Sequence, residues 1–187
     1  MNFDITILGE LTLRVVSETY DSVRLGTISK ELIGLCYSSD SDRIKTEAQF
    51  LMRHLIENPH LSQDDLIEIA TVNPFLAAHA VKTWPQNAEL SDIIWRCHSS
   101  QIINDRGAVN VVPFRGLMRS KVLSEEVLRE LVDRLSVHAN NGPQLLSIVR
   151  DHHPGKMIVE QVLRVDWLPA RLRRKIECES EKLGQFI

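Results

Sequence analysis

Cys97 and His98 are adjacent residues whose side chains could together bind a metal ion or form a catalytic pair. Adjacent side chains on a helix, however, point to different faces. Cys97 follows the apolar Ile93 and Ile94 at helical spacing. We therefore expect the Cys97 thiol to be buried in the core as a structural side chain.

Two further histidines, His152 and His153, directly precede Pro154 and stand in an expected loop. They could join a metal site, but no cysteine or histidine lies around them at the spacing of zinc ligands. We expect surface histidines here and predict no metal site.

Paired carboxylates occur at Asp64–Asp65, two positions after Ser62, and at Glu125–Glu126, directly after Ser124. Their place in a first helical turn explains them, because the positive end of a helix stabilises negative charge. No Gly-rich phosphate loop and no serine in a nucleophile elbow is found in the sequence. The sequence predicts a protein without enzymatic activity, catalytic residues or a cofactor.

Cations cluster near the C-terminus. Three of them fall on one face of the expected last helix, and a tryptophan nearby is of a type favoured as an interface anchor. We interpret this cluster as a candidate binding face, made of Arg164, Trp167, Arg171, Arg174 and Lys175.

This face suits an acidic protein partner or self-association, or alternatively a nucleic-acid backbone. Glutamates follow at 177, 179 and 181, no aromatic platform accompanies the arginines, and the chain carries a net charge of −3. Residues 1–100 contain 8 Lys and Arg against 14 Asp and Glu, whereas residues 101–187 contain 14 against 11. We expect a protein-binding or scaffold module, with nucleic-acid binding as the alternative; a solvated helix face also fits these residues.

The elements that position these residues begin with a recurring phrase, a leucine followed by serine or proline. It occurs at Leu61–Ser62, Leu90–Ser91, Leu123–Ser124 and Leu168–Pro169. A serine there can cap a helix, and the leucine can pack back on it. Recurrence after roughly thirty residues is typical of stacked helical repeats.

Apolar periodicity predicts a first helix over residues 5–19, although a strand over residues 3–8 remains open. Further helices are expected from Ser29, over Asp42–Glu57, and over Ser124–His138, which carries the clearest leucine stripe. Pro113 predicts a helix break or start. The predicted fold is all-α, a right-handed stack of short antiparallel helices. We expect one domain over residues 1–187, with an N-terminal helical cap (1–41) and a repeat stack (42–183).

The phrases over Asn58–Ala70, Asn87–Ser91 and Leu123–Leu128 resemble the leucine-rich repeat variant. They are more similar to an uncharacterised family of bacterial helical repeats, common in alphaproteobacteria, in which such phrases open successive helices. The resemblance covers residues 42–183 and departs over Gly107–Lys121. It implies a solenoid of the HEAT or leucine-rich-repeat-variant kind without established catalysis. Some leucine-rich repeat variant proteins carry an N-terminal iron–sulfur cluster, which the single Cys36 does not match.

Composition agrees with a globular protein, since 43% of the residues are hydrophobic. No apolar run of about eighteen residues predicts a transmembrane helix, and the first residues lack the pattern of a secretory signal. Three widely separated cysteines favour reduced thiols. We therefore expect a cytoplasmic protein.

Overall fold

The computed structural model describes Gly9, residues 21–182 and Gly184. The expected helix or strand over residues 3–19 lies outside the described residues, apart from Gly9. Within the described residues the fold is helical with no strand, which confirms the predicted all-α class. The helices are α2 (Ser22–Ser38), α3 (Asp42–Ile56), α4 (Gln63–Val72), α5 (Pro74–Thr83), α6 (Ala88–Ile102), α7 (Val111–Leu117), α8 (Glu125–Ser136), the 3-10 helix η1 (Ala139–Asn141), α9 (Gly142–His152), α10 (Lys156–Leu163) and α11 (Ala170–Lys182).

Most of the recurring phrases open helices as predicted. The Ser62 hydroxyl accepts a hydrogen bond from the Asp65 backbone N–H at 3.1 Å, and Ser124 accepts one from Val127 at 3.3 Å. These bonds satisfy backbone donors that have no partner within the first turn. The late phrase precedes α11, and Pro113 lies in the first turn of α7.

The prediction that Ser91 caps a helix is wrong. Helix α6 begins one turn earlier, where the Asn87 side chain accepts from the Leu90 N–H at 2.9 Å. Ser91 is instead buried within the helix, 2.7 Å from the hydroxyl of Ser120. Asn87 supplies an equally good cap, and the earlier start gains another helical turn.

The expected helix start at Ser29 is also wrong. Helix α2 begins at Ser22, after Asp21, whose carboxylate accepts a hydrogen bond from the Val23 N–H at 3.1 Å. Ser29 is buried inside the helix, and its hydroxyl donates to the Gly26 carbonyl at 2.8 Å. A buried serine can therefore sit in a helix by bonding the preceding turn.

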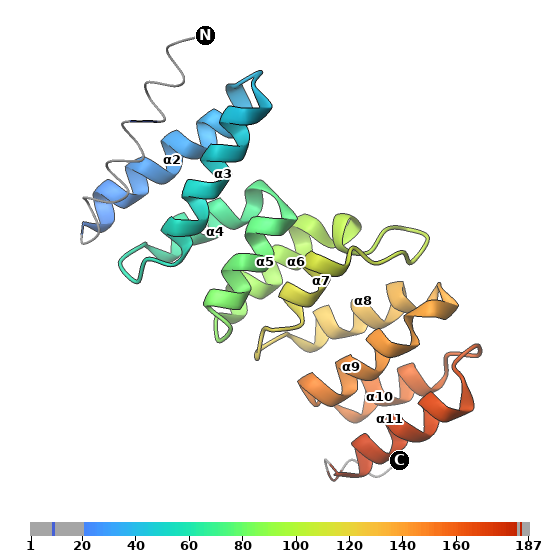
Figure 1. The fold of residues 1–187 in the computed structure, drawn as a ribbon. Helices are drawn as coiled ribbons and strands as arrows, with labels where there is room; N and C mark the ends of the chain where they lie inside the picture. Colours follow the sequence, from blue (N-terminus) through green and yellow to red (C-terminus); the bar gives the residue numbers. More distant parts are fainter. Residues whose placement is uncertain (1–8, 10–20, 183, 185–187) are drawn as a thin grey trace.

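The helices form two layers. Consecutive helices pack together from α2 through α7, as do α8 with α9 and α10 with α11. Helices two apart also pack together: α2 on α4 on α6, and α8 on α10, in one layer; α3 on α5 on α7, and α9 on α11, in the other. We term α2, α4, α6, α8 and α10 the first layer, and α3, α5, α7, α9 and α11 the second. The helices follow one another from α2 and α3 at one end to α10 and α11 at the other (Figure 1).

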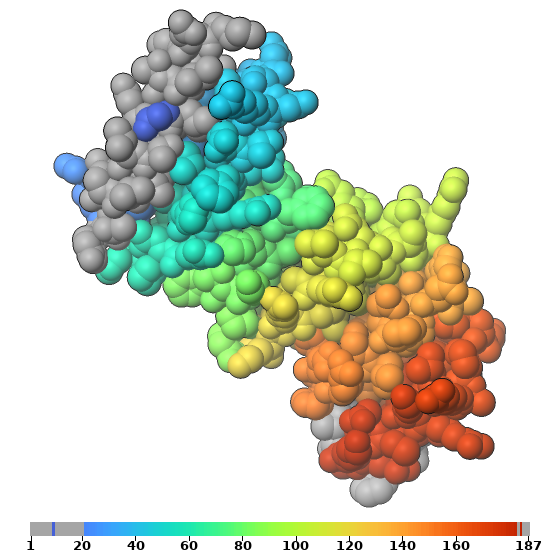
Figure 2. Space-filling view, in the orientation of Figure 1, coloured from blue at the N-terminus to red at the C-terminus, as the bar shows by residue number. Residues whose placement is uncertain are grey.

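Close backbone contacts are sparse between helices α2–α7 and helices α8–α11. Side chains join these two groups instead. The Trp95 indole N–H donates to the Glu130 carboxylate at 2.6 Å, and the Arg134 guanidinium lies 5.7 Å from the centre of the Trp95 ring. The space-filling view shows the resulting elongated molecule, with the helices α2 and α11 at opposite ends (Figure 2).

One apolar core runs between the layers, from Leu25 in α2 to Ile176 in α11. The predicted stripe on α8 belongs to it, since Leu128, Leu131 and Leu135 are all buried. None of the helices in the described part of the chain combines the length and the apolar character that crossing a bilayer requires.

Candidate functional site

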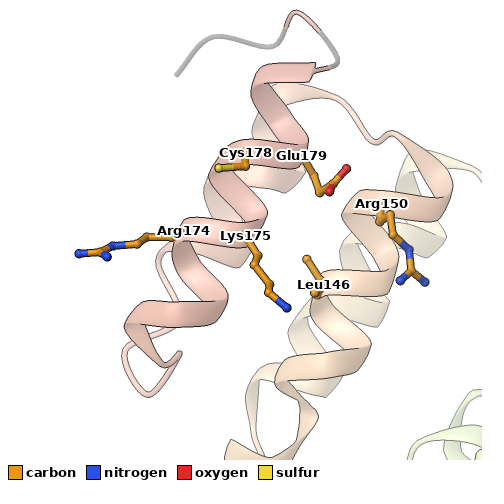
Figure 3. Close-up of a pocket in the computed structure, with 6 residues that line it drawn as sticks. All are labelled: Leu146, Arg150, Arg174, Lys175, Cys178 and Glu179. Carbon is orange, nitrogen blue, oxygen red and sulfur yellow. The ribbon is translucent and has the colours of Figure 1, made fainter.

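The cations expected on the last helix lie on an exposed side of α11. Arg171, Arg174 and Lys175 are exposed, and none of them forms an ion pair with a described residue. Their side chains do not point the same way: Arg174 extends away from α9, whereas Lys175 points toward Leu146 on that helix (Figure 3). The α11 cations therefore spread over a broad surface, not around one point.

A shallow pocket of about 330 Å³ lies between α9 and α11. Its lining combines one apolar residue with charged groups and a thiol: Leu146, Arg150, Arg174, Lys175, Cys178 and Glu179 (Figure 3). Arg150 donates to Asp151 at 2.6 and 2.9 Å, a hydrogen bond that also holds the pKa of that carboxyl below its usual value. Lys175 is thus the lining cation that points toward Leu146 without an ion pair to a described residue.

The other two members of the predicted face have local partners. Arg164 follows α10 and pairs with Glu160 at 3.4 Å. Trp167 is half-buried, and its indole N–H donates to the Ser136 carbonyl at 2.6 Å. The structure therefore groups Arg171, Arg174 and Lys175 on α11, whereas Trp167 is engaged with the end of α8.

The expectation of a buried thiol at Cys97 is wrong, because Cys97 is exposed and its neighbour His98 is buried. Ile94 and Trp95 lie on the buried side of α6, and His98 follows them at helical spacing. His98 Nε2 is 3.0 Å from the Ala70 carbonyl oxygen of α4. The pair is therefore divided between core and solvent, as adjacent helical residues usually are.

The two histidines at the end of α9 also have different surroundings. His152 is the last residue of the helix and is half-buried, and burial lowers the pKa of its imidazole, opposed by Asp151 and a backbone hydrogen bond with Met118. His153 is exposed with a left-handed backbone, at φ 47°. No group of three metal-ligating side chains occurs among the described residues.

Charge separates between the layers, a feature that division of the chain into halves does not reveal. The second-layer helices hold 11 Lys and Arg against 6 Asp and Glu, a net charge of +5. The described first-layer helices hold 6 against 11, a net charge of −5. Each second-layer helix carries an exposed cation in its last turn: Arg53, Lys82, Arg115, Arg150 and Lys182.

The second layer also exposes apolar side chains on its three neighbouring helices α3, α5 and α7. Phe50, Phe75 and Val112 are 53%, 45% and 58% exposed. On each helix a cation follows the apolar residue by three or seven positions, hence on the same side. We term this surface the central face, defined by Phe50, Arg53, Phe75, Lys82, Val112 and Arg115.

Comparison of the chain with models of known protein families, with curated proteins and with solved structures gives no match.

Proposed function

We propose that this chain is a non-enzymatic protein-interaction module built on a helical-repeat stack, and that its second layer is the binding surface. The separation of charge between the layers is the observation that carries this proposal. Exposed cations recur from helix to helix in the second layer, and solvent-facing apolar groups lie beside them. Stacked helical units present long surfaces of this kind to other proteins.

Recurring contacts support the repeat interpretation. Trp84 donates to the Ile56 carbonyl 28 residues earlier, and Trp167 donates to the Ser136 carbonyl 31 residues earlier. Trp84 follows α5 and bonds the last residue of α3, and Trp167 follows α10 and bonds the last residue of α8. In each pair the two helices belong to the same layer. Such bonds satisfy carbonyl groups that a helix leaves free at its C-terminus.

Two helical side chains repeat this arrangement in the first layer. His98 on α6 meets the Ala70 carbonyl of α4, 28 residues earlier, and Arg134 on α8 donates to the Ile103 carbonyl at the end of α6, 31 residues earlier. A recurrence close to thirty residues agrees with that of the leucine phrases. We include a cytoplasmic location in the proposal, supported by three free thiols, which suit a reducing compartment.

Nucleic-acid binding is a second candidate, favoured by the three α11 cations that have no ion pair with a described residue. A fluorescence anisotropy titration with duplex and single-stranded DNA and RNA, at low and moderate salt, separates the two candidates. We expect no salt-sensitive binding tighter than about micromolar. Such binding, if lost in the Arg171→Glu/Arg174→Glu/Lys175→Glu variant, would favour nucleic acid instead.

Self-association is measured with the same proteins. Sedimentation of the wild type and of the triple variant, at low salt, reports whether the α11 surface joins two copies. If α11 contributes to binding, the variant should associate with a protein partner or with itself more weakly, and added salt should have a similar effect on the wild type. Equal association of both proteins would assign α11 to solvent.

A further inference from the structure

Two contacts fix the register of the three helices that form the central face. Glu57, just after α3, pairs with His79 in α5 at 3.0 Å. Gly116 in α7 lies directly against the main chain of Ala78, so closely that a Cβ atom at Gly116 would overlap that residue. The end of α3, the middle of α5 and the second half of α7 are therefore at one level.

One turn before this level lie Arg53 on α3, Phe75 on α5 and Val112 on α7. They precede Glu57, His79 and Gly116, respectively, by one helical turn. Arg115 lies at the level of His79. Lys82 lies nearly one turn beyond it. Phe75 and Val112 thus lie at one level of the central face, with Arg53 on the α3 side and the other two cations toward the helix C-termini.

The composition of this face indicates the chemistry of its partner. Exposed apolar side chains on neighbouring helices, with charged residues beside them, are typical of protein-binding surfaces. The exposed Phe50, Phe75 and Val112 side chains favour a partner that offers apolar groups of its own over one recognised through phosphates alone. Positive charge at the border favours carboxylates in the partner.

We propose that the central face binds an acidic protein segment in which leucine or phenylalanine is flanked by aspartate or glutamate. This proposal rests on the proposed function and specifies the face and the partner. One helical turn is about 5.4 Å and neighbouring helix axes are about 8–10 Å apart. An extended segment advances about 3.3 Å per residue, so its acidic residues lie within three positions of its apolar ones.

The test uses the full chain and a fluorescein-labelled peptide that repeats the sequence Asp-Glu-Leu-Phe-Glu-Asp. Two control peptides replace either the apolar residues by serine or the acidic residues by lysine. We expect anisotropy to report binding of the first peptide only, weakened when salt rises from about 50 to 300 mM.

Two charge variants locate the binding site. Lys82→Glu/Arg115→Glu changes two exposed cations of the central face, and Arg96→Glu/Arg106→Glu changes two exposed cations on α6 and the turn after it. The first variant should bind the peptide at least about tenfold more weakly, and the second like the wild type. Phe75→Ser provides a charge-neutral check and should also weaken binding. Circular dichroism establishes that each variant is folded.

Several results would overturn the proposal. These are no binding of the acidic apolar peptide, equal binding of its serine control, or equal losses in the two charge variants. Tighter binding of a single-stranded oligonucleotide through Lys82 and Arg115 would replace it with a nucleic-acid site. The triple α11 variant separates this inference from the general function: a protein partner lost only in that variant would leave the interaction module standing and refute the central face as its site.

Discussion

Single side chains connect helices that are far apart in the sequence, and the tryptophans show this most clearly. The indole N–H groups of Trp84 and Trp167 each bond the final carbonyl of a helix in the same layer. The sequence pattern predicts Trp167 as an interface anchor in the candidate binding face. Its hydrogen bond and partial burial instead assign it, together with Trp84, to the packing of the stack.

Replacing either indole by a phenyl ring removes the donor and leaves a carbonyl without its partner. We predict that Trp84→Phe and Trp167→Phe each lower the free energy of unfolding by about 0.5–1.5 kcal/mol. Urea denaturation followed by circular dichroism measures the change. Tyr37→Phe, at a ring that is 70% exposed, is the control and should be neutral. If the tryptophan variants are as neutral as the control, the indole bonds contribute nothing to the stack.

His152 predicts a dependence of stability on pH. Burial lowers the pKa of its imidazole from the ordinary 6.5, so the unfolded chain takes up a proton before the folded chain does. Stability should therefore fall as pH decreases below about 6.5, until the folded pKa is reached. We predict that His152→Asn makes this part of the stability curve flatter.

The matched control is His153→Asn, because His153 is exposed and asparagine tolerates its left-handed backbone. Denaturant midpoints at a series of pH values between 5 and 8 (roughly the range in which histidine titrates) compare the three proteins. An unchanged slope in His152→Asn would show that another group causes the acid sensitivity.

At the scale of the elements, the apolar stripe of α8 is the part of the core that the sequence predicts best. Leu131 is fully buried at its centre. We predict that Leu131→Ala lowers the free energy of unfolding by about 2–5 kcal/mol, through lost burial and the cavity that remains. Arg129→Ala, at an exposed position of the same helix, should change it by less than about 0.5 kcal/mol. Similar midpoints for the two variants would contradict this core assignment.

Local signals predicted most helices but did not settle where every helix starts. Ser62 and Ser124 are the nearest good caps before their apolar stripes, and both cap as expected. Asn87 and Ser91 are both good caps one turn apart, and the sequence pattern does not choose between them. Packing decides: with α6 started at Ala88, Ser91 is buried against Ser120 and His98 against α4.

The candidate site could be predicted only in part, for a related reason. A cluster such as Arg171, Arg174 and Lys175 is visible in the sequence because its residues lie within two turns of one helix. The central face combines residues from α3, α5 and α7, with a first-layer helix between each two in the chain. Summing charge over alternate helices would have revealed the separation, but this requires the layer of each helix.

At the scale of the whole molecule, the first-layer and second-layer helices have opposite net charge, −5 and +5. Many first-layer carboxylates lie in first helical turns, such as Asp64, Asp65, Glu125 and Glu126, where the positive helix end stabilises them. Five of the eleven second-layer cations lie in last turns, where the negative helix end stabilises them. For these residues helix stability and surface recognition favour the same distribution of charge.

The most direct test of the proposed function is affinity capture from native cells with three versions of the full chain. These are the wild type, a second-layer variant (Lys82→Glu/Arg115→Glu/Arg174→Glu) and a variant of α6 and the turn after it (Arg96→Glu/Arg106→Glu), which we term the first-layer variant. The captured proteins are compared by quantitative mass spectrometry after nuclease treatment. We predict that the wild type and the first-layer variant retain the same protein partner and that the second-layer variant loses it. Retention of the partner by all three proteins would contradict protein binding through the second layer. So would loss of the partner from the wild type when nuclease is added to the capture.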